Sequence, residues 1–495
     1  MSWGADVLGV TEDTFSMIKA ATSGITYSTG IAGVDLQPLV SLVPVDTPFR
    51  NSNPRVPAKQ GAKYAYWRSL LNVNNTQSNA AVDFDFAGPV ANISEQDVFA
   101  PFAPLAQGGV VTQDALAEAN GYADALAVAT LQTLNQLLIS DDINQLVSIG
   151  YALPSIGTPS LTTAATGGSI GSGDAVHVQV AARSGPNYYY GGSGVASSDA
   201  TITVGTTSST NSVTASVAAV EAACAYDWFV GSTSTNQVYY TTTTVNTVTI
   251  TSIPTVKQPL PSLPLLSNVQ PDTPPTADSS YESYWQTGLL GSILGDFPSS
   301  SGVNTYVTPG TGTSQGAYYK SLDGGQLTVS GSAVEQLDAM NESIYNTWQI
   351  SPTRYLMGSQ SINDLSNVLL NTPQAVTYLQ PSDGRVGMQL GGYVATYLNK
   401  TVGGKAIALE LQPHLPPGKI IAVVDSIPFP GANIDTVLSV ETQLDYWRFD
   451  YGANRNAGTG GGGPRYDFEV RSIQAFRNKA GATMGVIDNI AAGLS

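Results

Sequence analysis

The stretch that decides the fold is TQDALAEANGYADALAVATLQTLNQLLISDDINQLVS, which occupies residues 112–148. Apolar and small residues recur along it at steps of three and four, a spacing that places them on one stripe of a helix. The residues on this stripe are Leu116, Ala119, Ala123, Leu126, Thr130, Leu134 and Leu137. Thr112 and Asp114 stand at its start, where acceptor and acidic side chains satisfy free backbone amides. The spacing predicts one long helix, whose first 27 residues alone would span roughly 40 Å, that crosses a flat domain as a strut; an ordinary amphipathic core helix is the simpler alternative.

Composition limits what such a chain can do. At 495 residues it is long enough for about two or three domains. Only 12% of its residues are charged, against about 25% in typical proteins, and it contains 50 Gly and 29 Pro, which favours a molecule rich in strands and loops. The net charge of −17 argues against nucleic-acid binding through a basic surface as the main activity, although an acidic surface could face DNA without binding it.

Upstream of the long stretch, residues 1–50 have the pattern of an arm, with a short helix over 12–21 and the proline-interrupted run LVSLVPVDTPF at 39–49. Residues 51–111 contain a long hairpin, with one expected strand at 62–70 (AKYAYWRSL) and the other at 81–90 (AVDFDFAGPV). A two-stranded ribbon is marginally stable by itself, so we expect this one to lie on another subunit. Asp83 and Asp85 share one face of the second strand, where a solvated strand face is favoured over a metal site.

Residues 154–258 form a region of different composition, poor in charge and rich in Thr, Ser, Gly and Tyr. Short alternating runs separated by turn residues predict an inserted immunoglobulin-like or fibronectin-type β-sandwich with Trp228 in its core. The expected strands are at 175–182, 200–205, 212–218, 226–231, 238–244 and 247–253.

Downstream of the insertion the pattern is mixed. Residues 259–430 contain expected helices at 333–348 and 361–370, and expected strands at 353–359, 393–398, 406–412 and 419–427. Residues 431–495 contain two long runs, 436–452 and 465–478, that we expect to pair as antiparallel strands around a glycine-rich connection. The predicted fold class is therefore α+β.

No arrangement of residues predicts a catalytic, cofactor-binding or metal site. His177 and His414 fall in different expected domains, and a metal site or catalytic triad would need them close to acids or nucleophiles. The single cysteine, Cys224, excludes an intrachain disulfide and lies in an apolar setting typical of an inert buried thiol. The best carboxylates for glycoside hydrolysis are Asp425, Glu441 and Asp445, but solvated surface acids are favoured for all three.

No secretion signal and no apolar run of the length of a membrane span stands in the sequence, which predicts a soluble chain made in a reducing cytoplasm.

The order of these parts resembles that of the major capsid proteins of tailed bacteriophages, which have the Hong Kong 97 type of fold. The resemblance rests on a P-x-D-T-P-F signature in the arm, followed closely by the strand residues AYW at 65–67. The signature residues are Pro44, Asp46, Thr47, Pro48 and Phe49. The resemblance implies an N-terminal arm (1–50), an extended loop and the start of the peripheral domain (51–111), a spine helix (112–153), the inserted sandwich (154–258), an axial domain (259–430), and peripheral-domain long strands with the C-terminus (431–495).

The resemblance implies a structural protein rather than an enzyme: a virion subunit that self-assembles into the hexamers and pentamers of an icosahedral head enclosing double-stranded DNA. The expected interface residues are Asp46, Thr47, Pro48 and Phe49, which would seat the arm, and Tyr64, Tyr66 and Trp67, which would dock the ribbon. Expected partners are other copies of the chain and separate scaffold, portal and decoration proteins, with no cofactor and no membrane; assembly would take place in the cytoplasm of the host bacterium.

Two departures from the family pattern modify this expectation. About 50 residues precede the extended loop, so any scaffold is expected to be a separate protein or absent. The loop tip at 72–80 has no Lys, which argues against covalent Lys–Asn welding of subunits.

Two other functions stay open on the sequence. A secreted or surface adhesin would use the sandwich to bind carbohydrate, through the tyrosines at 188–190 and 239–240, although tyrosine is also simply common in strands. A carbohydrate-active enzyme with an accessory sandwich would need a concave carboxylate pair.

Overall fold

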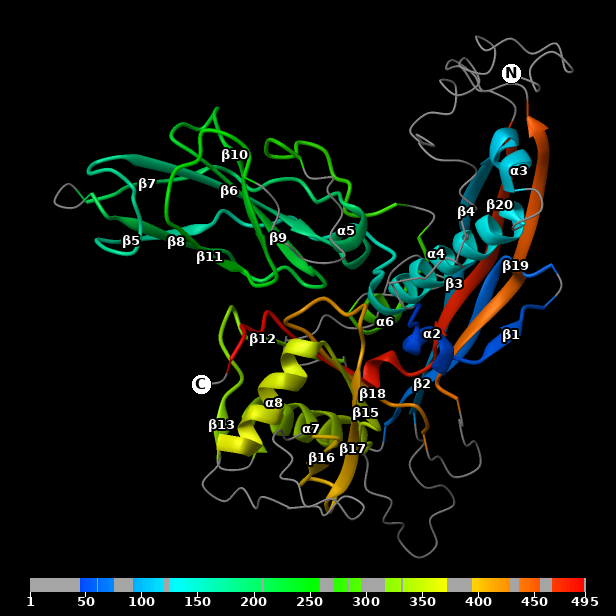
Figure 1. The fold of residues 1–495 in the computed structure, drawn as a ribbon. Helices are drawn as coiled ribbons and strands as arrows, with labels where there is room; N and C mark the ends of the chain where they lie inside the picture. The colour runs from blue at the N-terminus through cyan, green and yellow to red at the C-terminus, as the bar shows by residue number, and fades with distance from the viewer. Residues whose placement is uncertain are drawn as a thin grey trace, which may run out of the picture.

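The computed structural model describes residues 45–59, 61–74, 92–119, 124–205, 209–258, 271–282, 285–294, 317–330, 333–371, 394–427, 436–454 and 465–493. These residues form three sheet-containing parts, which Figure 1 shows as an elongated strand layer, a sandwich extending to one side, and a mixed sheet with helices. Most of the arm expected at 1–50, the expected strand at 81–90 with Asp83 and Asp85, and most of the loop tip lie outside the described residues.

The first part is a four-stranded sheet whose order is β1-β19-β20-β4. Its strands are β1 (Arg55–Pro57), β19 (Leu438–Asn454), β20 (Arg465–Asn478) and β4 (Ala103–Thr112). The two long strands predicted near the C-terminus are confirmed as the antiparallel pair β19–β20, with Leu438 opposite Asn478 and Asn454 opposite Arg465. Helix α4 (Ala125–Val147) lies along one face of this sheet (Figure 1).

The prediction of a single helix over 112–148 is wrong at its N-terminal end. Thr112 is the last residue of strand β4, a short helix α3 (Gln113–Ala119) follows, and α4 starts only after Asp124. Asp124 has an extended backbone, and its carboxylate accepts from the amides of Leu126 and Ala127, both at 3.0 Å. An acidic side chain in that position caps a new helix instead of continuing an old one. The apolar stripe itself is present, because Leu126, Leu134 and Leu137 pack against the sheet.

The hairpin expected after the arm is present, but the partner strand that the structure describes is not the expected one. Strand β2 (Tyr64–Asn74) pairs antiparallel with β3 (Asn92–Pro101), with Tyr64 opposite Pro101. A helical turn, α2 (Pro48–Ser52), precedes the hairpin.

The second part is a six-stranded sheet of order β12-β21-β18-β15-β17-β16. Its strands are β12 (Tyr318–Ser321), β21 (Gly485–Asp488), β18 (Ile420–Val423), β15 (Arg354–Met357), β17 (Lys405–Leu411) and β16 (Thr396–Asn399). Helices α7 (Glu335–Trp348) and α8 (Ser359–Asn371) cover one face, and β13 (Val329–Ser330) pairs with β14 (Ala333–Val334) beside them. Because β21 comes from the C-terminal end, the region predicted as 431–495 contributes to two sheets rather than one.

The third part is a sandwich of a four-stranded sheet, β10-β9-β6-β7, on a three-stranded sheet, β11-β8-β5. Its strands are β5 (Ser160–Ala164), β6 (Ala175–Arg183), β7 (Ala200–Thr203), β8 (Ser212–Ser216), β9 (Ala225–Gly231), β10 (Val238–Thr243) and β11 (Thr247–Ile250). Trp228 is fully buried between the sheets, as predicted. The immunoglobulin order is not what forms. That order puts the first, second, fourth and fifth strands in one sheet, whereas here the first and fourth strands (β5 and β8) lie in one sheet and the second and fifth (β6 and β9) in the other.

One continuous core joins the three parts. Residues of the sandwich, the C-terminal end of α4, helix α6 (Leu289–Leu294) and one face of the six-stranded sheet belong to the same buried cluster. Short helices fill the junctions, namely α5 (Gly185–Tyr190) and the 3₁₀ turn η1 (Gly481–Thr483). The buried Lys419 donates to Asp488 at 2.5 Å and to the carbonyl of Ala223 at 2.6 Å, which ties the six-stranded sheet to the sandwich. Among the described helices, none is long and apolar enough to cross a membrane.

Candidate subunit interface

The PVDTPF segment is anchored inside its own chain. Thr47 is 4% exposed and Phe49 is fully buried, with its ring 6.0 Å from that of Phe476 on β20. Pro48 is the first residue of α2, where a proline costs no hydrogen bond, and Asp46 is exposed. Phe49 is therefore anchored in its own subunit, and within the described part of this segment the exposed Val45 and Asp46 and the partly exposed Pro48 present surface to a neighbour.

Two adjacent carboxylates on α4, Asp141 and Asp142, hold this segment in place, and both are fully buried. Asp141 accepts from Arg50 Nε at 3.2 Å, from Arg55 Nη1 at 3.5 Å, and from Tyr446 Oη and Gln474 Nε2. We call Asp141 with these four donors the Asp141 cluster. It joins α2, β1, β19 and β20 to the helix.

Asp142 makes a second set of contacts. Its carboxylate accepts from the backbone amide of Arg50 at 2.8 Å and from His414 Nδ1 at 2.6 Å. His414, which the sequence left without a role, therefore connects the loop before β18 to the same helix. The helix end is a junction of four chain segments, and the only signal for it in the sequence was a pair of acids in an otherwise uncharged helix.

Tyr446 stays protonated within the Asp141 cluster. Burial and then the negative charge of Asp141 raise the pKa of Tyr446 above its usual value. The guanidinium groups of Arg50 and Arg55 lie 4.9 Å and 4.7 Å from the centre of its ring. The neutral phenol can thus donate to Asp141 while its ring faces two cations, an arrangement that compensates for burying charge.

The β2–β3 hairpin has two different faces at its base. Ala65 and Trp67 point inward and form a small cluster with Val98, Ala100 and Ala475 of β20, and Trp67 is only 6% exposed. Tyr64 and Tyr66, on the alternate positions, are 50% and 54% exposed. Trp67 therefore attaches the hairpin to its own chain, whereas Tyr64 and Tyr66 are accessible to a neighbour; docking on a neighbour stays a prediction for all three.

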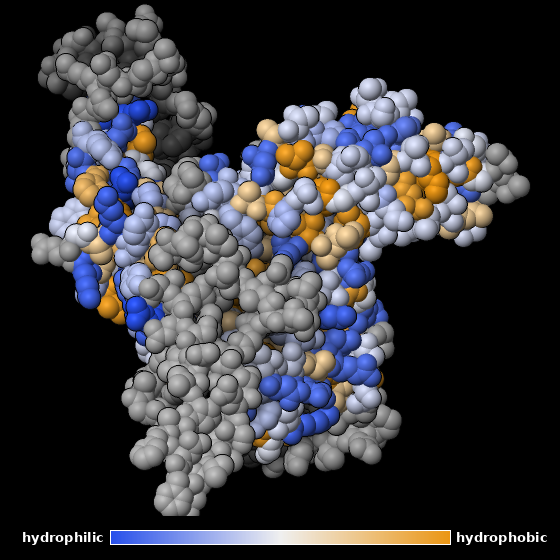
Figure 2. Space-filling model, turned by 180° about the vertical axis from the view of Figure 1, so that it is seen from behind, coloured by the Kyte–Doolittle hydropathy of each residue, from blue (hydrophilic) through white to orange (hydrophobic). Residues whose placement is uncertain are grey.

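Among the described residues, the face of the long-strand sheet opposite α4 is covered by the hairpin base at Ala475 and is exposed further along β19, which the sequence did not identify. It carries three exposed side chains at alternate positions of β19, Trp447, Phe449 and Tyr451, and Val110 of β4. We call these four residues the outer aromatic face. Figure 2, from behind, shows orange residues interleaved with blue ones along this layer.

Charged groups on the same face neutralise one another. Glu469 lies opposite Phe449 in the register and accepts from Tyr451 Oη at 2.6 Å. Arg471 lies opposite Trp447 and is 3.9 Å from Glu469. Paired charges between aromatic side chains are typical of a surface that can be desolvated by a partner.

The carboxylates considered for catalysis are each engaged in an ion pair. Asp425 pairs with Arg354 at 3.0 Å, Glu441 with Arg477, and Asp445 with Arg55 at 2.9 Å. Cys224 is buried, and burial raises the pKa of its thiol to about 12, as expected of an inert cysteine. Within the described part of the chain, no group of three or more His, Cys, Asp and Glu side chains is placed to hold a metal ion.

The tyrosines considered for sugar binding are mostly inside the protein. Tyr188, Tyr189 and Tyr239 are less than a tenth exposed, and Tyr190 donates to or accepts from Ser140 on α4. Tyr188 and Tyr189 form an edge-to-face pair 5.0 Å apart at the junction with α4. Tyr188, Tyr189 and Tyr239 are therefore core aromatics, whereas Tyr190 is 45% exposed.

No protein-family model and no curated protein matches this chain. Among solved structures it is similar to the capsid of a native GTA particle, at 8% identity and a TM-score of 0.42, over 94% of this chain and 99% of that one. It is similar to the capsid of cyanophage A-1(L), at 11% identity and a TM-score of 0.42, over 93% and 97% of the two chains. It is also similar to the holo-SrpI encapsulin complex from Synechococcus elongatus PCC 7942, at 9% identity and a TM-score of 0.38, over 92% and 93%.

Proposed function

We propose that this chain is the major capsid subunit of a bacteriophage, a structural protein that assembles with copies of itself into a closed shell around double-stranded DNA. The observation that carries the proposal is the outer aromatic face, on a sheet whose other face is already filled by α4. Aromatic side chains are enriched in protein–protein interfaces and supply many of their energetic hot spots.

The hairpin supports the same proposal. Its base is attached to the chain's own core through Ala65, Trp67 and Ala475, and the paired strands continue to Asn74 and Asn92. A two-stranded ribbon gains little stability by itself. Contact of Tyr64 and Tyr66 with a second copy would bury apolar area worth about 25 cal/mol per Å².

The remaining parts fit this role. The Asp141 cluster fixes residues 48–57, which directly follow the stretch expected to be the arm. The net charge of −17 would let packaged DNA lie near the wall without adhering to it. In this proposal hexamers and pentamers form an icosahedral head in the host bacterium's cytoplasm, with scaffold, portal and decoration proteins as separate partners.

The test is the assembly state of the purified full chain. Sedimentation velocity and negative-stain microscopy should find six-fold rings or closed particles. The double variant Tyr64→Ser/Tyr66→Ser should melt within a few degrees of the parent but assemble poorly, because both side chains are half exposed in the subunit. Val256→Ser, at a 67% exposed apolar residue away from the hairpin, is the matched control and should assemble normally.

A parent chain that stays monomeric at every concentration, with and without the proteins encoded beside it, would contradict the proposal. Normal assembly of the double Tyr variant would remove the hairpin from the interface.

A further inference from the structure

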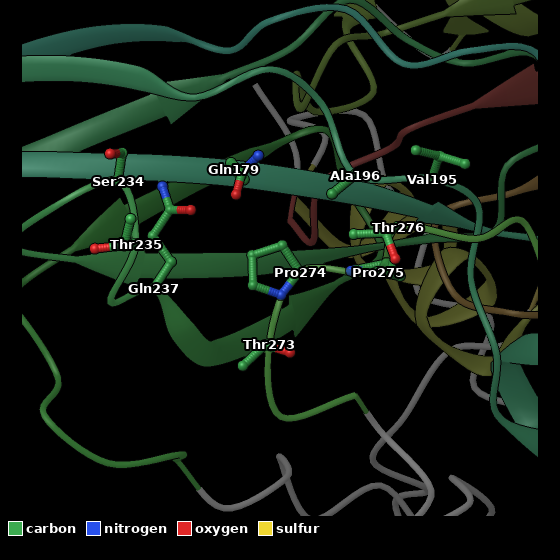
Figure 3. A pocket seen from close by; sticks show the side chains of 10 residues that line it. All are labelled: Gln179, Val195, Ala196, Ser234, Thr235, Gln237, Thr273, Pro274, Pro275 and Thr276. Atoms are coloured by element: carbon green, nitrogen blue, oxygen red, sulfur yellow. The ribbon is translucent and has the colours of Figure 1, made fainter.

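The inserted sandwich has a cavity on the face of its four-stranded sheet that points away from the sandwich core. Its volume is about 460 Å³, within the range of small-ligand sites. Gln179 of β6 lies on its floor, Gln237 and the loop before β10 form one wall, and Pro274 and Pro275 form another (Figure 3). The segment bearing these prolines is fixed to the sheet, because Pro275 O accepts from the amide of Ala196 at 2.9 Å.

The orientation of the Gln237 amide is determined by its neighbour. Its Nε2 donates to Asp199 Oδ1 at 2.6 Å, and an ionised carboxylate can only accept, so the amide nitrogen must face Asp199. Asp199 is itself held by His177 Nδ1 at 2.7 Å. Gln237 is 3% exposed, and within the described residues its Oε1 has no hydrogen-bond partner. A buried acceptor left unpaired is costly, and here it lines the cavity.

The Gln179 amide is fixed in the same way. Its Nε2 donates to the carbonyl oxygen of Ser197 at 2.7 Å, and a carbonyl can only accept. The amide oxygen is therefore the atom that Gln179 can offer to the cavity. Figure 3 shows the Gln179 side chain on the floor of the cavity and the Gln237 side chain on the adjoining wall.

The rest of the lining sets the chemistry of the ligand. None of the ten lining residues is charged, and four of them, Ser234, Thr235, Thr273 and Thr276, carry hydroxyl groups that can donate or accept. Two fixed acceptors require a ligand rich in donors, and the neutral lining disfavours an ion. The pyrrolidine rings of Pro274 and Pro275 offer an apolar wall of the kind that packs on a C–H face.

We propose that this cavity binds a neutral saccharide, one or two sugar units in size, whose hydroxyl groups donate to Gln237 Oε1 and Gln179 Oε1. The site is separate from the outer aromatic face and does not depend on assembly. It replaces the buried tyrosines as the place where the sandwich would contact carbohydrate.

The test is saturation-transfer NMR on the full chain with the methyl glycosides of glucose, galactose, mannose and N-acetylglucosamine as separate probes. At least one should receive saturation and be displaced by its own disaccharide. Gln179→Met and Gln237→Met should each weaken that binding roughly three- to tenfold, the loss of one hydrogen bond. Gln258→Met is the matched control, since Gln258 also donates to a backbone carbonyl, that of Val256, but lies outside the lining; it should bind as the parent does.

Gln237→Met removes the donor to Asp199 and could disturb folding, so Gln179→Met, at a half-buried position, is the decisive variant. Thermal melting of each variant separates lost binding from lost structure. The absence of saturation transfer from all four sugars would overturn the proposal, as would equal binding by the parent and Gln179→Met. Preferential binding of N-methylacetamide, a peptide-like donor, would also overturn it.

Discussion

Strands β9 and β19 have similar aromatic content but opposite environments. β9, AYDWFVG, is buried along its whole length, with Tyr226 and Trp228 in the main core and Phe229 packed on its other side against Tyr239. β19 has alternating aromatic residues too, but Trp447 and Tyr451 are 60% and 59% exposed. The sandwich covers both sides of its central strand by itself, whereas the long-strand sheet covers only one.

This difference indicates which region of the chain buries its aromatic residues within a single subunit and which does not. The sandwich should depend on its own packing for stability and should be indifferent to association. The long-strand sheet should depend on the Asp141 cluster within the chain and on a partner for its outer aromatic face. Substitutions in the two regions should therefore separate loss of folding from loss of assembly.

The largest expected effect is from Asp141→Asn. The substitution keeps the shape but removes the charge on which Arg50 and Arg55 depend, and breaking such a buried pair costs about 3–5 kcal/mol of unfolding free energy. Urea unfolding at neutral pH measures it. Asp272→Asn, at an exposed ion pair with Lys257, is the control and should change stability by less than about 0.5 kcal/mol. Equal small effects at both positions would mean that the cluster does not hold the long-strand sheet.

Next is Trp228→Phe in the sandwich. The smaller ring leaves a void in a fully buried site and removes the bond from Trp228 Nε1 to Thr243 Oγ1, for a loss of about 2 kcal/mol. Trp447→Phe makes the same chemical change on the exposed strand and should cost less than about 0.5 kcal/mol. Chemical denaturation of both variants makes the comparison, and similar losses would refute the contrast between the two strands.

A smaller effect, about 1 kcal/mol at neutral pH, is expected from Tyr446→Phe, which removes one donor to Asp141 and keeps the ring under Arg50 and Arg55. The pKa of Tyr446 is raised in the folded protein, so its contribution is complete below the unfolded value near 10 and is lost as pH rises through the folded value. The stability gap between parent and variant should therefore shrink above about pH 10. A gap that widens at alkaline pH would contradict the assignment of Tyr446 as a neutral donor.

Local pattern predicted much of the fold. The pair β19–β20, the helices α7 and α8 and most sandwich strands follow from periodicity, because their residues alternate or recur strongly enough to define one face. The start of α4 after Asp124 was not predicted. The apolar stripe continues across this residue, and its periodicity favoured one uninterrupted helix over a new helix capped by Asp124. The joining of β21 to the six-stranded sheet is a non-local pairing that no local signal encodes.

The candidate interface was only partly predictable for the same reason. Neighbouring strand residues such as Tyr66 and Trp67 in KYAYWR face opposite sides, yet both were expected to dock on a neighbour, because the sequence alone does not tell which face packs on Ala475. Phe49 looked like an arm contact because an apolar residue between prolines has no local core, and its partner Phe476 is far away in the chain. Asp141 and Asp142 are buried by partners from four distant segments, so only the folded chain identifies them.

The smallest expected effect on stability, and the most informative, is from Trp447→Ser. The side chain is 60% exposed in the subunit, so the unfolding free energy should change by less than about 0.5 kcal/mol. If the outer aromatic face is a contact between copies, the same substitution should weaken association by roughly 2 kcal/mol per interface, about thirtyfold, as removal of a central Trp does. Sedimentation velocity across a concentration series measures that shift against Val256→Ser. A variant that folds normally and assembles normally would show that β19 is exposed in the shell. The difference between β9 and β19 would then reflect solvent exposure alone and not association.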